Sequence, residues 1–322
     1  MTPLTYGIHT NVPEARYHAD ALLAVPTLSS SLARTIINQS PRHAWTQHPR
    51  LNPNHEPQDR KTFDIGRAAH RAVLGRGGDY VAIPSSYLAA NGAASTALAK
   101  DFIAEARAQG MTPLKEDEVE KIEVMAEAVA SRLAEMNITL APDRSEMVAL
   151  AEVDGVACRA MIDNAPADPR LPLYDFKTTT DASHDAVIRA VMNYGYDVQA
   201  AHYLDVWRAA TGESRRMRFI FVEKEPPHEV AVVELHDDPA SEADWMATAR
   251  SKAAEARRIW GECLSAGEWP GYPSRVARIG APGFHNARWA DREIGQPVIA
   301  RKPSPDALRA AYAAQAPEGV NA

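Results

Sequence analysis

The chain of 322 residues is 45% hydrophobic and 24% charged, which is ordinary for a globular protein with a sizeable core. Its two cysteines exclude a disulfide framework and a Cys-x-x-Cys metal site, and no apolar stretch approaches the roughly 20 residues of a membrane span. The formal net charge of −7 argues against a protein that coats nucleic acid through charge alone, although the placement of charges matters more than their sum.

Short helices are predicted within the first 60 residues. Ser29 to Ser31 are suitable N-cap residues, and Pro41 after Ser40 is typical of a first helical position. The N-terminus lacks the basic and apolar regions of a signal peptide, so we expect a cytoplasmic protein. We expect residues 1–60 to form a helical leader that packs on the core.

Helices come first in the rest of the chain, and strands follow. Three helices are predicted over 62–74, 97–108 and 116–136. Three strands then follow over 147–153, 156–163 and 171–177. The first two strands flank Asp154-Gly155, which is a strong two-residue hairpin signal.

A second group of helices and strands completes the pattern. Helices are predicted over 183–192, 197–210 and 239–266, and strands over 217–223 and 229–235. This order predicts one mixed α/β domain, with helices packed around a central sheet. We expect the core to span 61–270 and an extended tail to occupy 271–322.

Asp163, Asp175 and Lys177 are the strongest chemical signal. Asp175 and Lys177 are two residues apart on a predicted strand, so their side chains share one face and Phe176 points the other way. Asp163 ends the preceding strand, twelve residues earlier. Two carboxylates beside an ammonium can hold a hard divalent cation for phosphodiester hydrolysis. The alternative is two surface acids, with a lysine that pairs with either.

Further candidates lie around this group. Lys177 could position or deprotonate a nucleophile, and the hydroxyl of Thr178 could contact phosphate or help to cap the next helix. Gln199 and Tyr203 are four apart and share a helix face, where they could reach a phosphate or simply pack. His70 lies on a helix of small residues and becomes a ligand candidate only together with the other groups.

Together, His70, Asp163, Asp175-x-Lys177 and Gln199-x-x-x-Tyr203 resemble the ordered motifs of the PD-(D/E)xK nuclease superfamily. Within it they look like the branch of the RecB nuclease domain and the RecE-type exonuclease VIII of phage recombination systems. The flanking segments 28–32, 40–43 and 63–70 are also similar to RecE-type sequence, and the resemblance covers about residues 15–275.

The resemblance implies a twisted sheet that carries the acids, with flanking helices that supply the histidine and the Gln/Tyr pair. It implies that His70, Asp163, Asp175 and the backbone carbonyl of Phe176 bind Mg²⁺ or Mn²⁺, with two ions bridged by Asp163. Lys177 would then be a catalytic base or electrostatic stabiliser. Gln199 and Tyr203 would contact DNA phosphate or orient the site.

The resemblance also implies digestion of linear double-stranded DNA, 5′ to 3′, which leaves 3′ single-stranded overhangs. Relatives work as ring-shaped homo-oligomers (trimers or tetramers) beside a single-strand annealing protein of the RecT type. We expect DNA to be gripped in a basic channel lined by five arginines: Arg67, Arg71, Arg215, Arg216 and Arg218.

Other readings stay open at this point. The chain could be a non-cleaving DNA-binding or scaffold protein on a nuclease fold, or an endonuclease or single-strand-specific nuclease of the same superfamily. The complete set of ligands and Lys177 favours an enzyme. Glu146 and Glu152 precede the motif hairpin, and each could be a further ligand or, as we favour, a salt-bridge residue.

Overall fold

The computed structural model describes residues 2–56, 61–75 and 79–293. The chain divides into two units, Met1–Tyr272 and Pro273–Ala322. Among the described residues, none of the helices combines the length and apolar character that crossing a membrane requires.

Seven strands form the main sheet of the first unit, in the order β1-β5-β6-β7-β8-β9, with β2 paired to β6 off this path. The strands are β1 (Gly7–His9), β2 (Leu28–Ser29), β5 (Ser145–Val153), β6 (Val156–Asn164), β7 (Leu173–Thr179), β8 (Met217–Glu223) and β9 (Val230–Glu234). The β7–β8 and β2–β6 pairs are parallel and the others antiparallel, so the sheet is mixed, as predicted.

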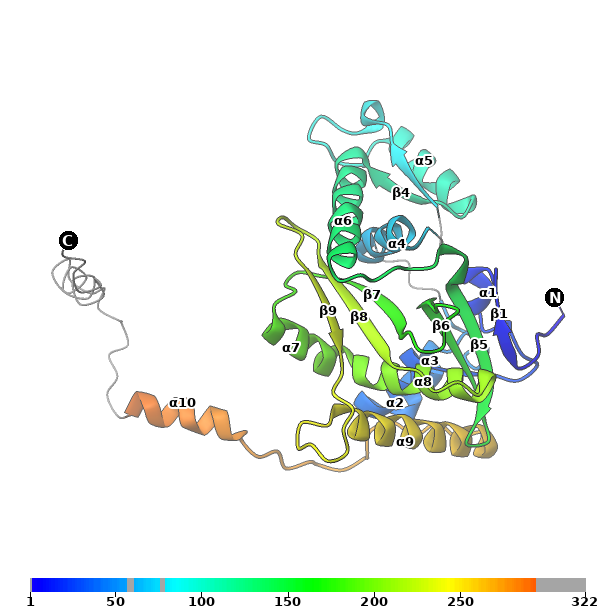
Figure 1. Ribbon diagram of the computed structural model, residues 1–322, viewed down its shortest axis with the longest axis vertical. Helices are drawn as coiled ribbons and strands as arrows, with labels where there is room; N and C mark the ends of the chain where they lie inside the picture. The colour runs from blue at the N-terminus through cyan, green and yellow to red at the C-terminus, as the bar shows by residue number, and fades with distance from the viewer. Residues whose placement is uncertain (1, 57–60, 76–78, 294–322) are drawn as a thin grey trace. The chain divides into compact units, whose positions relative to one another are not determined.

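Helices cover both faces of this sheet (Figure 1). One face packs against α2 (Ser30–Asn38), α8 (Tyr196–Thr211) and α9 (Trp245–Ala266). The other face packs against α4 (Lys61–Leu74) and α6 (Glu116–Glu135). The mixed α/β fold predicted from the sequence is therefore confirmed.

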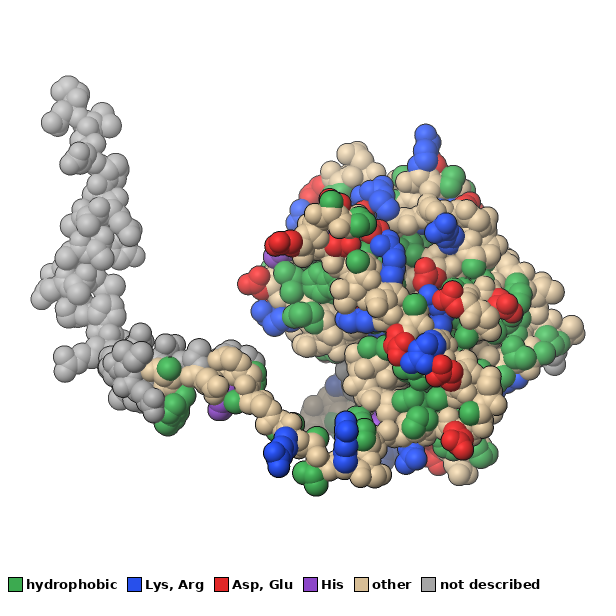
Figure 2. Space-filling view, turned by 90° about the horizontal axis from the view of Figure 1, so that it is seen from below, with side chains coloured by type: hydrophobic (Ala, Val, Ile, Leu, Met, Phe, Trp, Pro, Cys, Tyr) green, Lys and Arg blue, Asp and Glu red, His purple; other side chains and the backbone are tan. Residues whose placement is uncertain are grey.

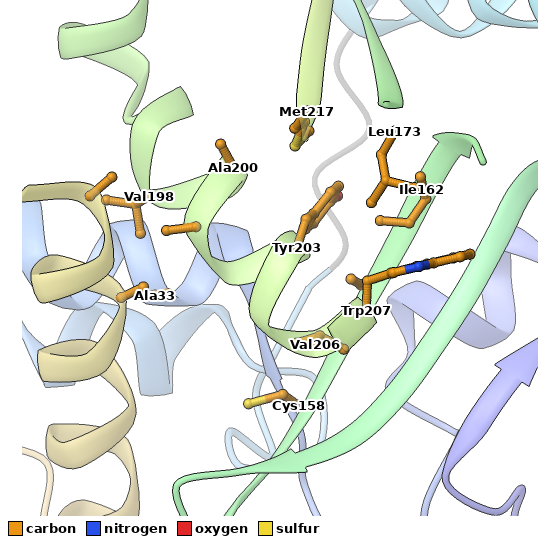
Figure 3. Close-up of a cluster of buried hydrophobic side chains, with 14 of the residues drawn as sticks. Ala33, Cys158, Ile162, Leu173, Val198, Ala200, Tyr203, Val206, Trp207 and Met217 are labelled. Carbon is orange, nitrogen blue, oxygen red and sulfur yellow. The ribbon is translucent and has the colours of Figure 1, made fainter. Parts of the chain in front are cut away.

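The larger core lies between the sheet and α8. Figure 3 shows Val198, Tyr203 and Trp207 of α8 pointing into this cluster, which also contains Cys158 and Ile162 of β6. Trp207 and Ile162 are almost completely buried, at 1% and 0% exposure. Burial of such side chains contributes about 2 kcal/mol each, so this packing fixes α8 firmly against β5 and β6.

The remaining elements are smaller. They are α1 (Glu14–His18), α3 (Pro41–Gln47), α5 (Ala97–Ala108), α7 (His184–Tyr194), two 3₁₀ turns (Ser85–Tyr87 and Pro142–Arg144), and a two-stranded parallel sheet of β3 (Tyr80–Ile83) and β4 (Thr112–Lys115). The four short strands β1 to β4 were not predicted. Strands of two to four residues carry too little alternation to stand out in a sequence.

Two further predictions differ from the structure. The last helix of the first unit begins at Trp245 rather than at 239, because Asp244 caps it by accepting hydrogen bonds from the N–H groups of Met246 and Ala247 at 3.0 and 3.3 Å. In the second unit, α10 (Gly283–Glu293) lies within the tail predicted to be extended. Residues 294–322 of that tail lie outside the described residues.

A fork between β6 and β7 is the part of the fold that positions the candidate site. β5 occupies one edge of β6 along its length. On the other edge, β2 pairs only with Cys158 and Arg159, and β7 pairs only at Asn164. The residues between, including Asp163, face a gap in the sheet. Strand ends that diverge in this way free their polar groups to bind a ligand.

Candidate metal and catalytic site

A cavity of about 570 Å³ opens at this fork. Its lining combines groups from distant parts of the chain, among them His70 of α4, Asp163 of β6, Lys177 of β7 and Tyr203 of α8. These residues are far apart in the sequence, and the structure brings them to one place. Asp175 lies directly behind the lining, beside Lys177.

Asp163 is the anchor of the site. Its Oδ2 accepts a hydrogen bond from the backbone N–H of Phe176 at 2.7 Å and lies 2.8 Å from Nε2 of His70. Burial would raise the pKa of the Asp163 carboxyl, but the His70 ring and the Lys177 ammonium outweigh burial and hold this pKa below its usual value. Asp163 therefore stays ionised at neutral pH.

His70 is held mainly by carboxylates. Burial disfavours its protonated ring, but Asp163, then Asp175 and Glu146, outweigh this effect and raise the pKa of His70. The ring also packs edge-on against Phe176, with centroids 6.0 Å apart. His70 thus reaches the fork from the α4 face of the sheet.

Asp175 and Lys177 approach from the opposite face, under α8. The Lys177 ammonium forms an ion pair with Oδ2 of Asp175, while Nε2 of Gln199 donates to Oδ1 at 2.5 Å. Lys177 also lies 4.9 Å above the ring of Tyr196, within range of a cation–π interaction. The shared face predicted for Asp175 and Lys177 is therefore seen in the structure.

The pKa values of this pair move in the same direction. Burial, and then repulsion by Asp163, raise the pKa of Asp175 to about 6, although Lys177 opposes the shift. Burial would lower the pKa of Lys177, but Asp175 and Asp163 outweigh it and raise that pKa. Lys177 is therefore protonated at neutral pH.

The backbone carbonyl of Phe176 also faces the fork. Leu173 N–H donates to Arg216 O, and Thr179 O accepts from Lys224 N–H, so the odd-numbered residues of β7 bond to β8. Alternate residues of a parallel strand bond to opposite sides, which turns the polar groups of Phe176 toward β6. The Phe176 N–H bond to Asp163 agrees with this direction.

Tyr203 lines the cavity from α8 and is 8% exposed. The side chain of Ser30, at the start of α2, lines the same cavity and acts to lower the pKa of the Tyr203 hydroxyl group. Burial raises the pKa of Tyr203 well above its usual value, so the hydroxyl group stays neutral and can donate a hydrogen bond. Gln199 and Tyr203 share one helix face, as predicted, and both line the cavity.

The donor set fits a hard divalent cation: a histidine nitrogen, two carboxylates and a backbone carbonyl. The two carboxylates repel each other, and this repulsion contributes to the raised pKa of Asp175. A cation between them would relieve that repulsion. In the described part of the chain, no three His, Cys, Asp or Glu side chains are already arranged around a metal position. His70 instead contacts Asp163, and Lys177 contacts Asp175.

Three of the predicted DNA contacts lie at or near this cavity. Arg67 and Thr178 line it, and Arg67 also donates a hydrogen bond to Asp64 at 2.8 Å. Arg71 lies one turn further along α4, where its guanidinium bonds to Asp79 at 2.8 Å and to the carbonyl of Gly75. The helix after Thr178 begins at His184 with Ser183 as its N-cap residue, so Thr178 belongs to β7 rather than to a helix cap.

The other three arginines are not brought to the cavity. The Arg215 side chain is 1% exposed and donates to the backbone oxygens of Pro166, Asp168 and Leu171, which leaves no surface for a phosphate. The prediction for Arg215 is therefore corrected. Arg216 and Arg218 lie beside it at the start of β8 and pair with Glu234. In the parallel register Arg218 is opposite Tyr174, at the far end of β7 from Lys177.

Sequence reasoning missed several groups at the site. Tyr196 lies under Lys177 but belongs to none of the motifs, and Arg34 and Lys224 line the cavity from α2 and the end of β8. Glu146, by contrast, was predicted to be a salt-bridge residue, and its Oε1 lies 3.9 Å from Nδ1 of His70, in agreement with that prediction. Its position opposite Asp163 in the hairpin register was a signal available in the sequence.

Comparison with known proteins identifies the family. Residues 29–279 match the family described as a PDDEXK-like domain of unknown function (DUF3799). The chain belongs to this family. The resemblance to the PD-(D/E)xK superfamily is thereby confirmed.

A solved structure of the same fold supports this assignment. The crystal structure of a protein from Eubacterium rectale, described as a candidate exonuclease, matches with a TM-score of 0.55 and 13% sequence identity. The match covers 89% of this chain and 100% of the other. At this identity the likeness shows the fold alone. Comparison with curated proteins gave no match.

Proposed function

We propose that this PDDEXK-like protein is a metal-dependent deoxyribonuclease that hydrolyses phosphodiester bonds. One observation supports the proposal above all. Asp163, His70 and Lys177 line one cavity, and Asp175 lies directly behind that lining in an ion pair with Lys177. Surface acids at unrelated strand ends, the alternative considered from the sequence, would not converge in this way.

We infer that the cofactor is Mg²⁺ or Mn²⁺, which His70, Asp163, Asp175 and the carbonyl of Phe176 would hold. When bound, such ions supply Lewis acidity, which activates water and neutralises charge on the phosphate. The lowered pKa of Asp163 keeps this carboxylate ionised and ready to bind a cation.

The chain's own groups would stabilise and orient the substrate. Protonated Lys177 supplies a positive charge beside the scissile phosphate, which favours electrostatic stabilisation over the role of a base. Gln199 holds Asp175 in place through its amide, and neutral Tyr203 can donate a hydrogen bond to a phosphate oxygen. Arg67 and Thr178 line the same cavity and would contact the DNA backbone, with Arg71 further out.

The finer part of the proposal comes from the resemblance to RecE-type enzymes. We propose exonucleolytic digestion of linear duplex DNA from 5′ to 3′, which leaves 3′ overhangs for recombination. We also propose a ring-shaped homo-oligomer that works with an annealing protein of the RecT type. Light scattering coupled to size-exclusion chromatography tests the ring, and a monomer at working concentration would contradict it.

A degradation assay tests the central proposal. The full chain is incubated with linear, nicked and circular DNA, with Mg²⁺ or with chelator. We expect degradation of linear duplex only, and only with metal. Lys177→Ala and Asp163→Ala should each lose roughly 10²-fold or more in rate, since each removes a group at the reacting phosphate.

Lys121→Ala is the matched control, because this lysine lies on α6 outside the cavity lining and pairs with Glu225 on the surface. It should keep the wild-type rate. Full activity of Lys177→Ala would overturn the assigned mechanism. Cleavage of circular DNA would instead point to an endonuclease with the same site, and binding without cleavage to a DNA-binding protein on this fold.

A further inference from the structure

Glu146 has an unusual backbone for a strand residue. It lies in β5 between two regular pairs, Ser145↔Asn164 and Met147↔Ile162, so its position in the register is opposite Asp163. Its φ is +53°, in the left-handed region. The pairs on both sides keep the same register, so no residue has been inserted into the strand. The ladder is interrupted at the one position that faces the acid of the fork.

This conformation has a cost. A left-handed backbone disfavours a residue with a Cβ by roughly 1–2 kcal/mol, and glycine or asparagine would adopt it more readily. Such strain persists where surrounding structure enforces it, and it often accompanies function. The strain does not by itself assign a role to Glu146, but the position of its side chain does.

The Glu146 carboxylate lies next to His70. Its Oε1 is 3.9 Å from Nδ1 of His70, its side chain is 20% exposed, and it lines the same cavity as Asp163. The imidazole ring therefore has a carboxylate at each nitrogen, with Asp163 at 2.8 Å from Nε2. At 3.9 Å, the contact with Glu146 is electrostatic and too long for a hydrogen bond.

When His70 holds a cation, one ring nitrogen is the metal ligand and the other carries the ring proton. Nε2 faces Asp163, so it is the nitrogen that would act as a ligand, and a ligand nitrogen carries no proton. The ring proton must then be on Nδ1, the side of Glu146. A carboxylate beside this N–H group stabilises the tautomer that has its proton on Nδ1, and it orients the ring of a metal-bound histidine.

We propose that Glu146 is the positioning residue for His70: it holds the ring proton on Nδ1 so that Nε2 is presented to the cation. This inference rests on the proposed function, since it requires a cation at the fork. It adds a residue outside the motifs that carry the resemblance. The strained backbone at position 146 is the structural cost of bringing this carboxylate to the ring.

The test separates metal binding from folding. Mn²⁺ affinity is measured by calorimetry on the full chain, and thermal unfolding is measured in chelator, for wild type, Glu146→Gly and Glu146→Gln. Glu146→Gly should bind Mn²⁺ about 10- to 100-fold more weakly, as expected when a residue that orients a ligand is removed. Its metal-free unfolding temperature should be equal or higher, because glycine relieves the strain. A merely structural glutamate would not give this combination.

Glu146→Gln provides the conservative rescue. Its amide oxygen still presents a partial negative charge to Nδ1–H, so this variant should retain most of the affinity that Glu146→Gly loses. Asn137→Gly is the control for placing glycine at a left-handed position elsewhere, at φ +55°, and should bind Mn²⁺ like wild type.

Three results would overturn the inference. Unchanged Mn²⁺ affinity in Glu146→Gly would show that the carboxylate has no role toward the cation, while the proposed function would stand. An equal loss in Glu146→Gln and Glu146→Gly would make Glu146 a direct ligand rather than a positioning residue. Absence of Mn²⁺ binding by wild type would remove the inference and the proposed function together.

Discussion

The two carboxylates of the fork are held by different partners. Asp163 accepts a backbone N–H and faces His70, and its pKa is lowered. Asp175 is more deeply buried and lies within the field of Asp163, and its pKa is raised to about 6. One carboxylate is thus stably ionised, and the other is costly to ionise. In the metal-free protein, Asp175 should therefore lower stability at neutral pH.

Asp175→Asn tests this cost. The pKa of Asp175 is raised from 3.8 to about 6, so between these pH values the folded state keeps a proton that the unfolded state has lost. Stability falls as the pH rises through this window, by about 3 kcal/mol at most. In chelator at pH 8, urea unfolding should show Asp175→Asn to be more stable than wild type, and the gain should largely vanish near pH 4.

Added Mg²⁺ should reverse this ranking, because it stabilises only the protein that binds it. Asp101→Asn, an exposed change on α5, controls for the removal of a carboxylate and should show neither effect. If the wild type were the more stable protein at pH 8 in chelator, the assigned repulsion between Asp163 and Asp175 would be wrong.

At the level of residues, the motifs were predictable and the supporting groups were not. Asp175 and Lys177 could be placed on one face because strand periodicity is simple. The arginine predictions failed at Arg215, because a long side chain can turn inward to backbone carbonyls that no sequence pattern reveals. The strained φ of Glu146 depends on tertiary contacts, so the sequence could suggest the residue but not its conformation.

At the level of elements, α8 and the ends of β6 and β7 build the site. α8 begins directly after Gly195, which has φ +63° and joins it to α7. A Cβ at Gly195 would lie 3.0 Å from Cδ of Arg34, whose guanidinium donates to the carbonyl of Tyr194 at 2.5 Å. The start of α8, with Tyr196 and Gln199, therefore depends on a position that only glycine fills well.

Gly195→Ala should destabilise the protein more than Gly212→Ala. Both changes place a Cβ at a left-handed position, at φ +63° and +77°, which costs roughly 1–2 kcal/mol. Of the two, only Gly195 has a neighbour within 4 Å of the added atom. Urea unfolding gives the difference between the two variants, and a DNA degradation assay should show reduced activity for Gly195→Ala alone. Equal decreases in stability would mean that the clash with Arg34 is easily relieved.

The elements were largely predictable where they are long. The strands β5 to β9 and the helices α4 to α8 lie close to their expected positions, because each has a clear period of two or 3.6 residues. The strands β1 and β2 could not be predicted, since two or three residues pair with the sheet only when β5 and β6 are already in place. The pairing of β2 along β6 is one boundary of the fork.

At the level of the whole molecule, charge is divided unevenly along the chain. Residues 273–322 contain seven Lys or Arg and four Asp or Glu, although the chain as a whole has a net charge of −7. The first unit is therefore strongly acidic, and Figure 2 shows acidic and basic side chains interspersed on one of its faces. A basic segment would attract the phosphate backbone of DNA, which the acidic first unit repels.

Arg275, Arg278 and Arg292 are exposed and allow a test of this idea. Changing all three to Gln should weaken binding to duplex DNA in chelator. The slope of the logarithm of the binding constant against the logarithm of the salt concentration should also become shallower, by about 0.9 for each phosphate that an arginine no longer neutralises. The matched control changes Arg132, Arg250 and Arg258, which pair with carboxylates on the first unit. An unchanged slope in the tail variant would show that these arginines do not contact DNA.

The most direct test of the central claim is a crystal structure of the full chain grown with Mn²⁺ and measured at the manganese absorption edge. We expect an anomalous peak within bonding distance of carboxylate oxygens of Asp163 and Asp175 and of Nε2 of His70, with the ammonium of Lys177 beside it. A peak elsewhere in the molecule, or a fork in which His70 still contacts Asp163 with no ion between them at saturating Mn²⁺, would contradict it.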